Sequence, residues 1–125
     1  MLEELAQKSS KANSKQEISG LLLLSNTTFL QVLEGPTTEV NSLFKKIIND
    51  SRHDVVQLID YQQINDYLFS DWAMNILDLF NLPKISRDLL ISKYSEIDGF
   101  VEIPNEGRLA LSLLLDAQAL LKQET

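Results

Sequence analysis

The hydrophobic pattern of the first residues has a helical period. Leu2, Leu5 and Ala6 are spaced by three and four positions, and the same stripe continues through the polar Ser9 and Asn13. This spacing predicts an amphipathic helix over about the first dozen residues. Both polar residues would face inward at the lower end of the stripe.

A change of period follows at Ile18. The run ISGLLLLS is short, apolar and without alternation, which is typical of a strand buried on both faces. Asn26 and Thr27 suit a turn, and TFLQVLEG then alternates as the second arm of a hairpin. On that second arm Phe29, Gln31 and Leu33 share one face, and Leu30, Val32 and Glu34 share the other.

The next elements follow a break in the chain. Pro36 suits the first position of a helix whose apolar residues recur at three and four positions and which should end near Asp50. The stretch DVVQLIDYQQI, residues 54–64, is rich in β-branched residues and predicts a third strand. A further strand is expected over residues 73–79.

The remaining chain is predicted to be helical. A short helix is expected over residues 85–94, then a loop containing Gly99 and Pro104, and a last helix over about residues 108–122. The last helix is apolar almost all round, so two of its surfaces should be covered, one by its own domain and one by another subunit.

This order of elements indicates an α+β sandwich with helices on one face of a mostly antiparallel sheet. A ferredoxin-like sandwich begins with a strand before its first helix, and no strand precedes Leu2. We therefore expect a ferredoxin-like sandwich that lacks its N-terminal strand and carries a C-terminal helical extension. The expected division is a core over residues 1–80 and a helical cap over residues 81–125.

Composition narrows the classes of function. With 18 acidic and 11 basic side chains the net charge is −7, which disfavours nucleic acid and anionic lipid surfaces as partners. The chain has no cysteine, so thiolate chemistry and cysteine-ligated metals are excluded. The longest apolar run is too short to span a bilayer, and the N-terminus does not resemble a signal peptide. We expect a soluble, cytoplasmic protein.

Two amides are candidates for ligand binding. Gln31 lies on an otherwise apolar strand face and would need both its donor and its acceptor satisfied if buried, which a heteroaromatic ligand could do. The simpler alternative is that Gln31 meets water or a backbone group. Asn13 has the same two interpretations, as a ligand contact between helix and sheet or as a helix cap.

His53 is the only histidine, and no carboxylate spacing near it matches a zinc or hydrolase motif. With Asp50 and Arg52 it forms DSRH at the end of a helix, which could bind an anionic group or simply be a solvated loop. Trp72 and Met74 lie two residues apart and so share a strand face, where packing is the default explanation and contact with a flat ring is the alternative.

The order and spacing of these segments resemble one known family. KANSKQEISGLLLLSNTTFLQVLEGP, then INDSRH, then FSDWAMN look like the BLUF domain, the blue-light-sensing flavin module, from Ser9 to about Met74. The remainder is similar to the helical cap of short, stand-alone cyanobacterial members. The resemblance implies an FAD-binding photoreceptor that signals through protein contacts, is not an enzyme and forms a homo-oligomer.

The resemblance also implies roles for individual residues. Asn13 would hydrogen-bond the flavin ring and Gln31 would be the switching amide beside it, with Leu22 and Phe29 against the ring and Ser9 near its pocket. Arg52 and His53, next to Asp50, would hold the ribityl or phosphate side. Trp72 and Met74 would relay the signal from Gln31.

In this family a tyrosine on the first strand reacts with the photoexcited flavin, and that position would fall before Met1. Tyr61, Tyr67 and Tyr94 do not match it. Two hypotheses follow: a start assigned at an internal methionine, or a genuine truncation. In the second case the chain could be a light-independent interaction module that keeps the fold and has lost flavin. An enzyme of ferredoxin-like fold is a third alternative, although no nucleophile, general base pair or metal cluster supports it.

Overall fold

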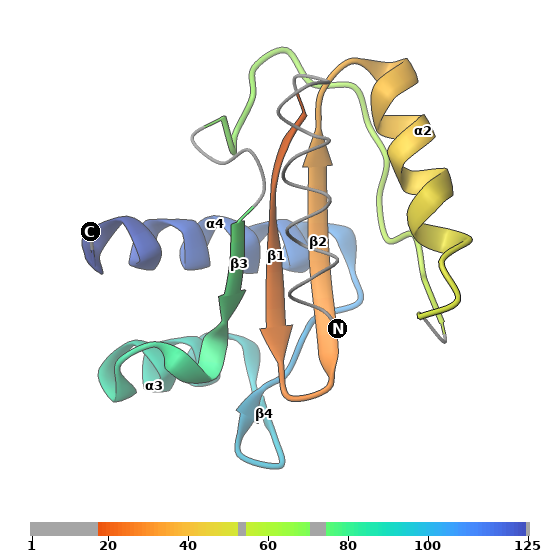
Figure 1. The fold of residues 1–125 in the computed structure, drawn as a ribbon. Helices are drawn as coiled ribbons and strands as arrows, with labels where there is room; N and C mark the ends of the chain where they lie inside the picture. The colour runs from red at the N-terminus through yellow and green to blue at the C-terminus, as the bar shows by residue number, and fades with distance from the viewer. Residues whose placement is uncertain (1–17, 53–54, 71–74, 125) are drawn as a thin grey trace. The chain divides into compact units, whose positions relative to one another are not determined.

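The computed structural model describes residues 18–52, 55–70 and 75–124 (Figure 1). The chain divides into two compact units. The first unit consists of Met1–Gly20 and Leu33–Asn75, and the second of Leu21–Val32 and Ile76–Thr125. The predicted N-terminal helix lies outside the described residues, as do the first positions of the strand expected over residues 73–79.

The predicted hairpin is confirmed. Strand β1 spans Ser19–Ser25 and strand β2 spans Thr28–Glu34, joined by a two-residue turn. Asn26 in this turn has a φ of 56°, a left-handed conformation that asparagine tolerates better than most residues. The leucines at positions 21 to 23 are at most 2% exposed, as expected of a strand covered on both faces.

The turn fixes the register of the hairpin. A two-residue loop places Ser25 opposite Thr28, and continuing the ladder places Leu22 opposite Gln31. The same register sets Ser19 opposite Glu34. The Ser19 Oγ donates a hydrogen bond to the Glu34 Oε1 over 3.5 Å, which agrees with that register.

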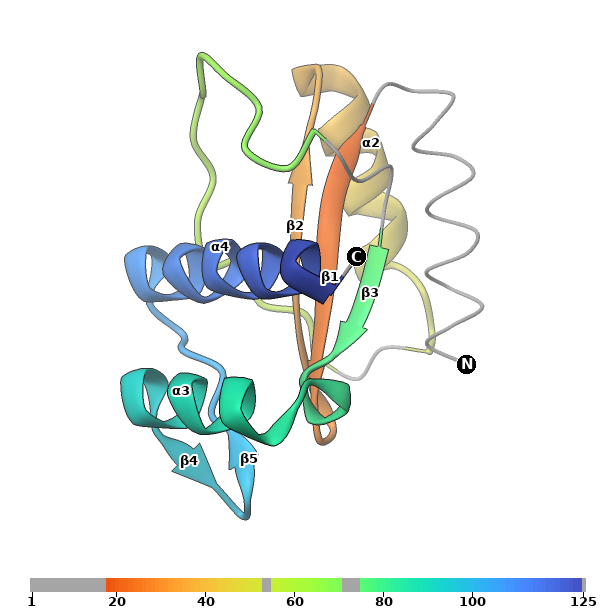
Figure 2. The ribbon, with the colours of Figure 1, turned by 90° about the vertical axis from the view of Figure 1, so that its left-hand side faces the viewer.

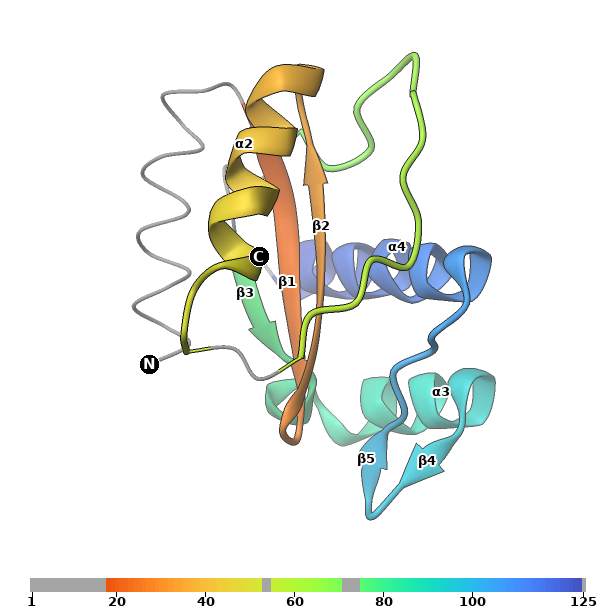
Figure 3. The ribbon, with the colours of Figure 1, turned by 90° about the vertical axis from the view of Figure 1, so that its right-hand side faces the viewer.

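Strand β3, Asn75–Asp78, completes a three-stranded sheet of order β2-β1-β3. The predicted third strand is wrong: residues 55–64 are irregular in the structure (Figure 3). Val55 is 83% exposed and Leu58 is 55% exposed. A β-branched composition favours a strand only where a neighbouring strand pairs with it, and no described strand pairs with this segment.

Helix α2 spans Thr37–Ile48 and belongs to the first unit. Pro36 is the residue before the helix, one position earlier than predicted. Glu39 in the first turn and two lysines in the last turn complement the helix dipole. The apolar face of the helix is buried against the open end of the hairpin, in a cluster made of Ile18, Leu33, Val40, Leu43 and Ile47.

A buried carboxylate organises the first unit. Glu34 is only 6% exposed, although its position on an alternating strand gave no sign of this. Its Oε1 accepts from the backbone N–H of Phe69 at 2.7 Å and its Oε2 from that of Leu68 at 2.8 Å. Phe69 is itself fully buried. The carboxylate therefore supplies the hydrogen-bond acceptors that these two backbone N–H groups would have in a helix or a sheet.

The second unit contains the remaining helices (Figure 2). A single 3-10 turn, η1, spans Leu79–Asn81 and is capped by Asp78, whose carboxylate accepts from the Phe80 N–H at 3.0 Å. Helix α3 spans Lys84–Tyr94 and helix α4 spans Gly107–Glu124, which confirms both predicted helices. Ala110, Leu113, Leu114 and Ala117 of α4 are buried, whereas Leu109 is 51% exposed.

The segment between these helices was predicted as a plain loop, and the structure corrects this. It contains a small antiparallel hairpin of β4, Glu96–Ile97, and β5, Phe100–Val101. Asp98 and Gly99 form its turn with φ values of 52° and 84°. Asp-Gly is a common sequence for such a two-residue turn, so the signal was present in the sequence.

Tyr94 links α3 to α4. Its hydroxyl donates to the Asp116 Oδ2 at 2.5 Å and lies 2.6 Å from the Ser112 Oγ. The Lys93 Nζ also reaches Asp116, at 2.9 Å. Burial and the hydrogen bond to Asp116 both raise the pKa of Tyr94 above its ordinary value of 10.0. The phenol therefore keeps its proton, and with it the donor that joins the two helices.

Glu34→Gln is expected to destabilise the protein by about 1–3 kcal/mol, because one of the two accepting oxygens is replaced by a donor that faces a buried N–H. Urea denaturation measures the change. The control is Glu102→Gln, since Glu102 is exposed. Equal stabilities of the two variants would show that the Glu34 contacts contribute little.

Tyr94→Phe should lower the free energy of unfolding by about 1–2 kcal/mol at neutral pH, because the hydrogen bonds of the hydroxyl are lost. Because the pKa of Tyr94 is raised in the folded state, its contribution to the free energy of unfolding is complete below pH 10.0. This contribution is lost as pH rises through the pKa of Tyr94 in the folded protein. Wild-type stability should therefore fall more steeply above pH 10.0 than that of the variant. Denaturation midpoints across this range test it, with the exposed Tyr67→Phe as control. Parallel profiles for wild type and Tyr94→Phe would contradict the assignment.

Candidate functional site

Three of the predicted binding residues lie in the second unit, on the hairpin. Leu22 is 2% exposed, and Phe29 and Gln31 are half-buried. Since Leu22 lies opposite Gln31 and side chains alternate along a strand, Leu22, Phe29 and Gln31 share one face of the hairpin. Gln31 also interacts with other groups of the protein.

Two further predicted residues lie in the first unit, just after α2. The Arg52 Nη2 is 2.6 Å from the Asp50 Oδ2, and the Arg52 Nε is 3.0 Å from the Asp50 Oδ1. The backbone N–H of Arg52 also donates to Asp50, at 2.9 Å. This two-pronged pair holds the guanidinium in one orientation beside the end of the helix. Both side chains keep some exposure, 27% for Arg52 and 19% for Asp50.

The other predicted site residues lie outside the described residues. These are Ser9, Asn13, His53, Trp72 and Met74. Their proposed roles stay predictions.

The hairpin face has the chemistry that a flat heteroaromatic ring requires. In the register of the turn, Leu22, Leu24 and Phe29 lie on the same hairpin face as Gln31 and give it apolar neighbours. A glutamine amide offers two donors and an acceptor, and a fused ring offers an apolar surface with polar atoms at its rim. The residues of this face therefore fit a flavin ring.

The described residues carry no sign of metal chemistry. Over residues 18–52, 55–70 and 75–124, no group of three histidine, aspartate or glutamate side chains could hold a metal ion. Within those same ranges, no helix has the length and hydropathy that crossing a bilayer requires.

None of the three tyrosines is part of a described strand. Tyr61 and Tyr67 lie in residues 55–70, which form no helix or strand, and are 52% and 45% exposed. Tyr94 is the helix link of the second unit. These are all the tyrosines of the chain.

Comparison with known proteins assigns the class. The family described as "Sensors of blue-light using FAD" matches residues 1–75. A match over more than half of the chain places it among flavin-binding sensory domains. The chain belongs to the BLUF family.

The curated relatives are longer proteins. The chain is 31% identical over 80 residues to the blue light- and temperature-regulated antirepressor BluF of Escherichia coli, covering 62% of this chain and 19% of that protein. It is 31% identical over 74 residues to the photoactivated adenylate cyclase subunit beta of Euglena gracilis, covering 58% of this chain and 9% of that one. The chain thus spans less than a fifth of the length of either.

Solved structures confirm the predicted fold class. The dark-state structure of BlrB, a BLUF protein, superposes with a TM-score of 0.72 at 24% identity, covering 97% of this chain and 83% of that one. At that identity the likeness is one of fold. The ferredoxin-like α+β architecture and the C-terminal helical extension are both confirmed.

Proposed function

We propose that this chain is an FAD-binding blue-light sensory domain that signals through protein–protein contacts. The observation that carries the proposal is Gln31, a half-buried amide on an apolar hairpin face, opposite Leu22 in the register of the turn. Membership of the BLUF family supports the same ligand. The proposed division is a flavin-binding core over residues 1–80 and a helical cap over residues 81–125.

The hairpin residues would position the ring. Leu22 and Phe29 pack against it, and the Gln31 amide hydrogen-bonds its polar rim, as would Asn13. Bound flavin supplies the absorption of blue light. The terminal oxygen and nitrogen of the Gln31 side chain differ little in size, so rotation of the amide exchanges donor for acceptor without moving the strand.

The residues after α2 would hold the other end of the cofactor. Asp50 fixes the orientation of the Arg52 guanidinium, which is a strong partner for phosphate oxygens. His53 follows directly in the sequence and Ser9 would adjoin the ring. Trp72 and Met74 would carry the change at Gln31 outward.

The cap supplies candidate contact surfaces for signalling. Ile85 and Leu89, one turn apart on α3, are 74% and 62% exposed, and Leu109 on α4 is 51% exposed. Exposed apolar side chains at such spacing favour contacts with other proteins. A second copy of the chain is one such partner, and a downstream signalling protein is the other.

The first test is the absorption spectrum of the purified 125-residue chain in darkness and under blue light. We expect a yellow protein that releases equimolar FAD on denaturation and whose flavin bands shift reversibly on illumination. Chromatography of the released flavin distinguishes FAD from FMN and riboflavin. A folded protein that takes up no flavin, even when FAD is added, would reject the proposal.

Gln31→Leu tests the site. Loss of one or two hydrogen bonds to the ring should weaken FAD binding by about threefold to tenfold and abolish the light-induced shift. Fluorescence titration with FAD and the difference spectrum measure the two effects. Gln57→Leu, the same change at an exposed position, should leave both unaltered. A normal light response in Gln31→Leu would remove Gln31 from the switch.

A light-independent interaction module is the second candidate function. It is favoured by one observation: none of the three tyrosines lies on β1, β2 or β3. The same spectra separate the candidates. A colourless, folded chain would support this second function. A yellow chain without a light response would support FAD binding and contradict the proposed light sensing.

A further inference from the structure

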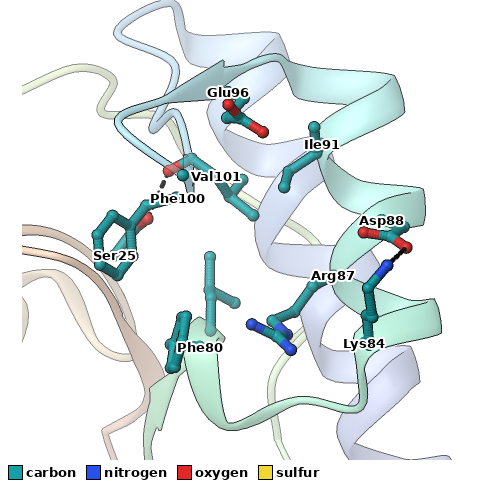
Figure 4. A pocket seen from close by; sticks show the side chains of 11 residues that line it. Ser25, Phe80, Lys84, Arg87, Asp88, Ile91, Glu96, Phe100 and Val101 are labelled. Atoms are coloured by element: carbon teal, nitrogen blue, oxygen red, sulfur yellow. Dashed lines mark hydrogen bonds and ion pairs between the residues drawn. The ribbon is translucent and has the colours of Figure 1, made fainter.

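A small cavity lies within the second unit, between the turn η1, helix α3 and the β4–β5 hairpin (Figure 4). Its volume is about 160 Å³. Phe80 and Phe100 form an aromatic wall, with ring centroids 5.5 Å apart and planes tilted by 46°. The Ser25 hydroxyl donates a hydrogen bond to the Val101 carbonyl, and this bond joins the β4–β5 hairpin to the end of β1. None of its lining residues is among those proposed to hold flavin.

Arg87 lines this cavity, and its half-buried side chain lies over an aromatic ring. Its guanidinium carbon lies 4.5 Å from the centre of the Phe80 ring, a cation–π contact. Its Nε is buried and makes no hydrogen bond, and within the part of the chain that the structure describes no ion pair involves it. A buried guanidinium donor without an acceptor is uncommon in proteins. The Nε itself has almost no accessible surface, so an acceptor on a ligand would meet the other donors of this half-buried guanidinium.

The other charged groups that line the cavity form no ion pair with Arg87. Lys84 and Asp88 pair with each other at 2.8 Å, one helical turn apart, and so neutralise each other. Glu96 lines the end of the cavity away from Arg87 (Figure 4). An anionic group would therefore be attracted to the Arg87 end and repelled from the Glu96 end, which gives a bound ligand one orientation.

Size and shape restrict the ligand. A cavity of about 150 Å³ accepts a benzene-sized molecule, whereas sites for drug-sized ligands begin at about 300 Å³. A guanidinium matches the planar, two-oxygen geometry of a carboxylate. The two phenylalanine rings suit a flat apolar group next to that carboxylate.

We propose that this cavity binds a carboxylate attached to a small aromatic group, with the carboxylate on Arg87 and the ring against Phe80 and Phe100. Two sources carry this chemistry: a free arylacetic acid, and a peptide chain that ends in phenylalanine. The site shares no residue with the proposed flavin site, so its test is independent of the test of light sensing.

The test is an NMR titration of the full 125-residue chain with phenylacetate and, separately, with the tripeptide Gly-Gly-Phe. Phenylacetamide and the C-terminal amide of the tripeptide are the neutral counterparts. We expect saturable shifts at Phe80, Arg87 and Phe100, and at least tenfold weaker binding of each neutral counterpart. Tighter binding of phenylacetate indicates a free acid as the ligand, and tighter binding of the tripeptide indicates a chain end.

Arg87→Gln should weaken the binding of phenylacetate and of the tripeptide at least tenfold. Glu96→Gln should strengthen the binding of both. Arg108→Gln is the matched control, because the Arg108 side chain is 97% exposed on α4. The proposal is overturned if neither carboxylate saturates the site, or if acids and amides bind equally well to the wild-type chain. The comparison of acid with amide needs no variant and so remains decisive if Arg87→Gln does not fold.

Discussion

The register of the β1–β2 hairpin is the constraint on which the other features of the structure depend. A two-residue turn at Asn26 and Thr27 sets it, and a slip by one residue would move every side chain of β2 to the opposite face. Gln31 would then leave the apolar face that it shares with Leu22. At the far end of the ladder Glu34 would no longer face Ser19, and its contacts with the backbone of Phe69 would be lost.

Glu34 extends this constraint to a segment without regular structure. Residues 55–64 have the β-branched composition of a strand, but strand propensity expresses packing and pairing with neighbours rather than an intrinsic preference of the chain. In the described sheet they have no pairing partner, and Val55, Leu58 and Ile64 are exposed. The Glu34 carboxylate instead holds the chain that follows this segment, by accepting hydrogen bonds from the N–H groups of Leu68 and Phe69.

The sequence predicted those elements whose signal is local. Hydrophobic periodicity was sufficient for β2, α2, α3 and α4, and a short unbroken apolar run was sufficient for β1. The Asp-Gly turn of the β4–β5 hairpin was equally local and was overlooked. Glu34 could not be predicted, since its partners lie 34 and 35 positions away. Arg87 could not be singled out either, because only tertiary structure brings Phe80 and Phe100 beside it.

The two polar side chains of greatest interest, Tyr94 and Gln31, differ in burial. Tyr94 is buried, is bonded to both Ser112 and Asp116, and has a raised pKa, so its proton is retained in a link between two helices. Such a phenol is poorly suited to giving up a proton during signalling. Gln31 is half-buried, uncharged and set among apolar neighbours, where turning one amide changes the hydrogen-bond pattern while packing stays the same. The switching role that we propose for Gln31 agrees with these neighbours, whereas the contacts of Tyr94 give it a structural role in the second unit.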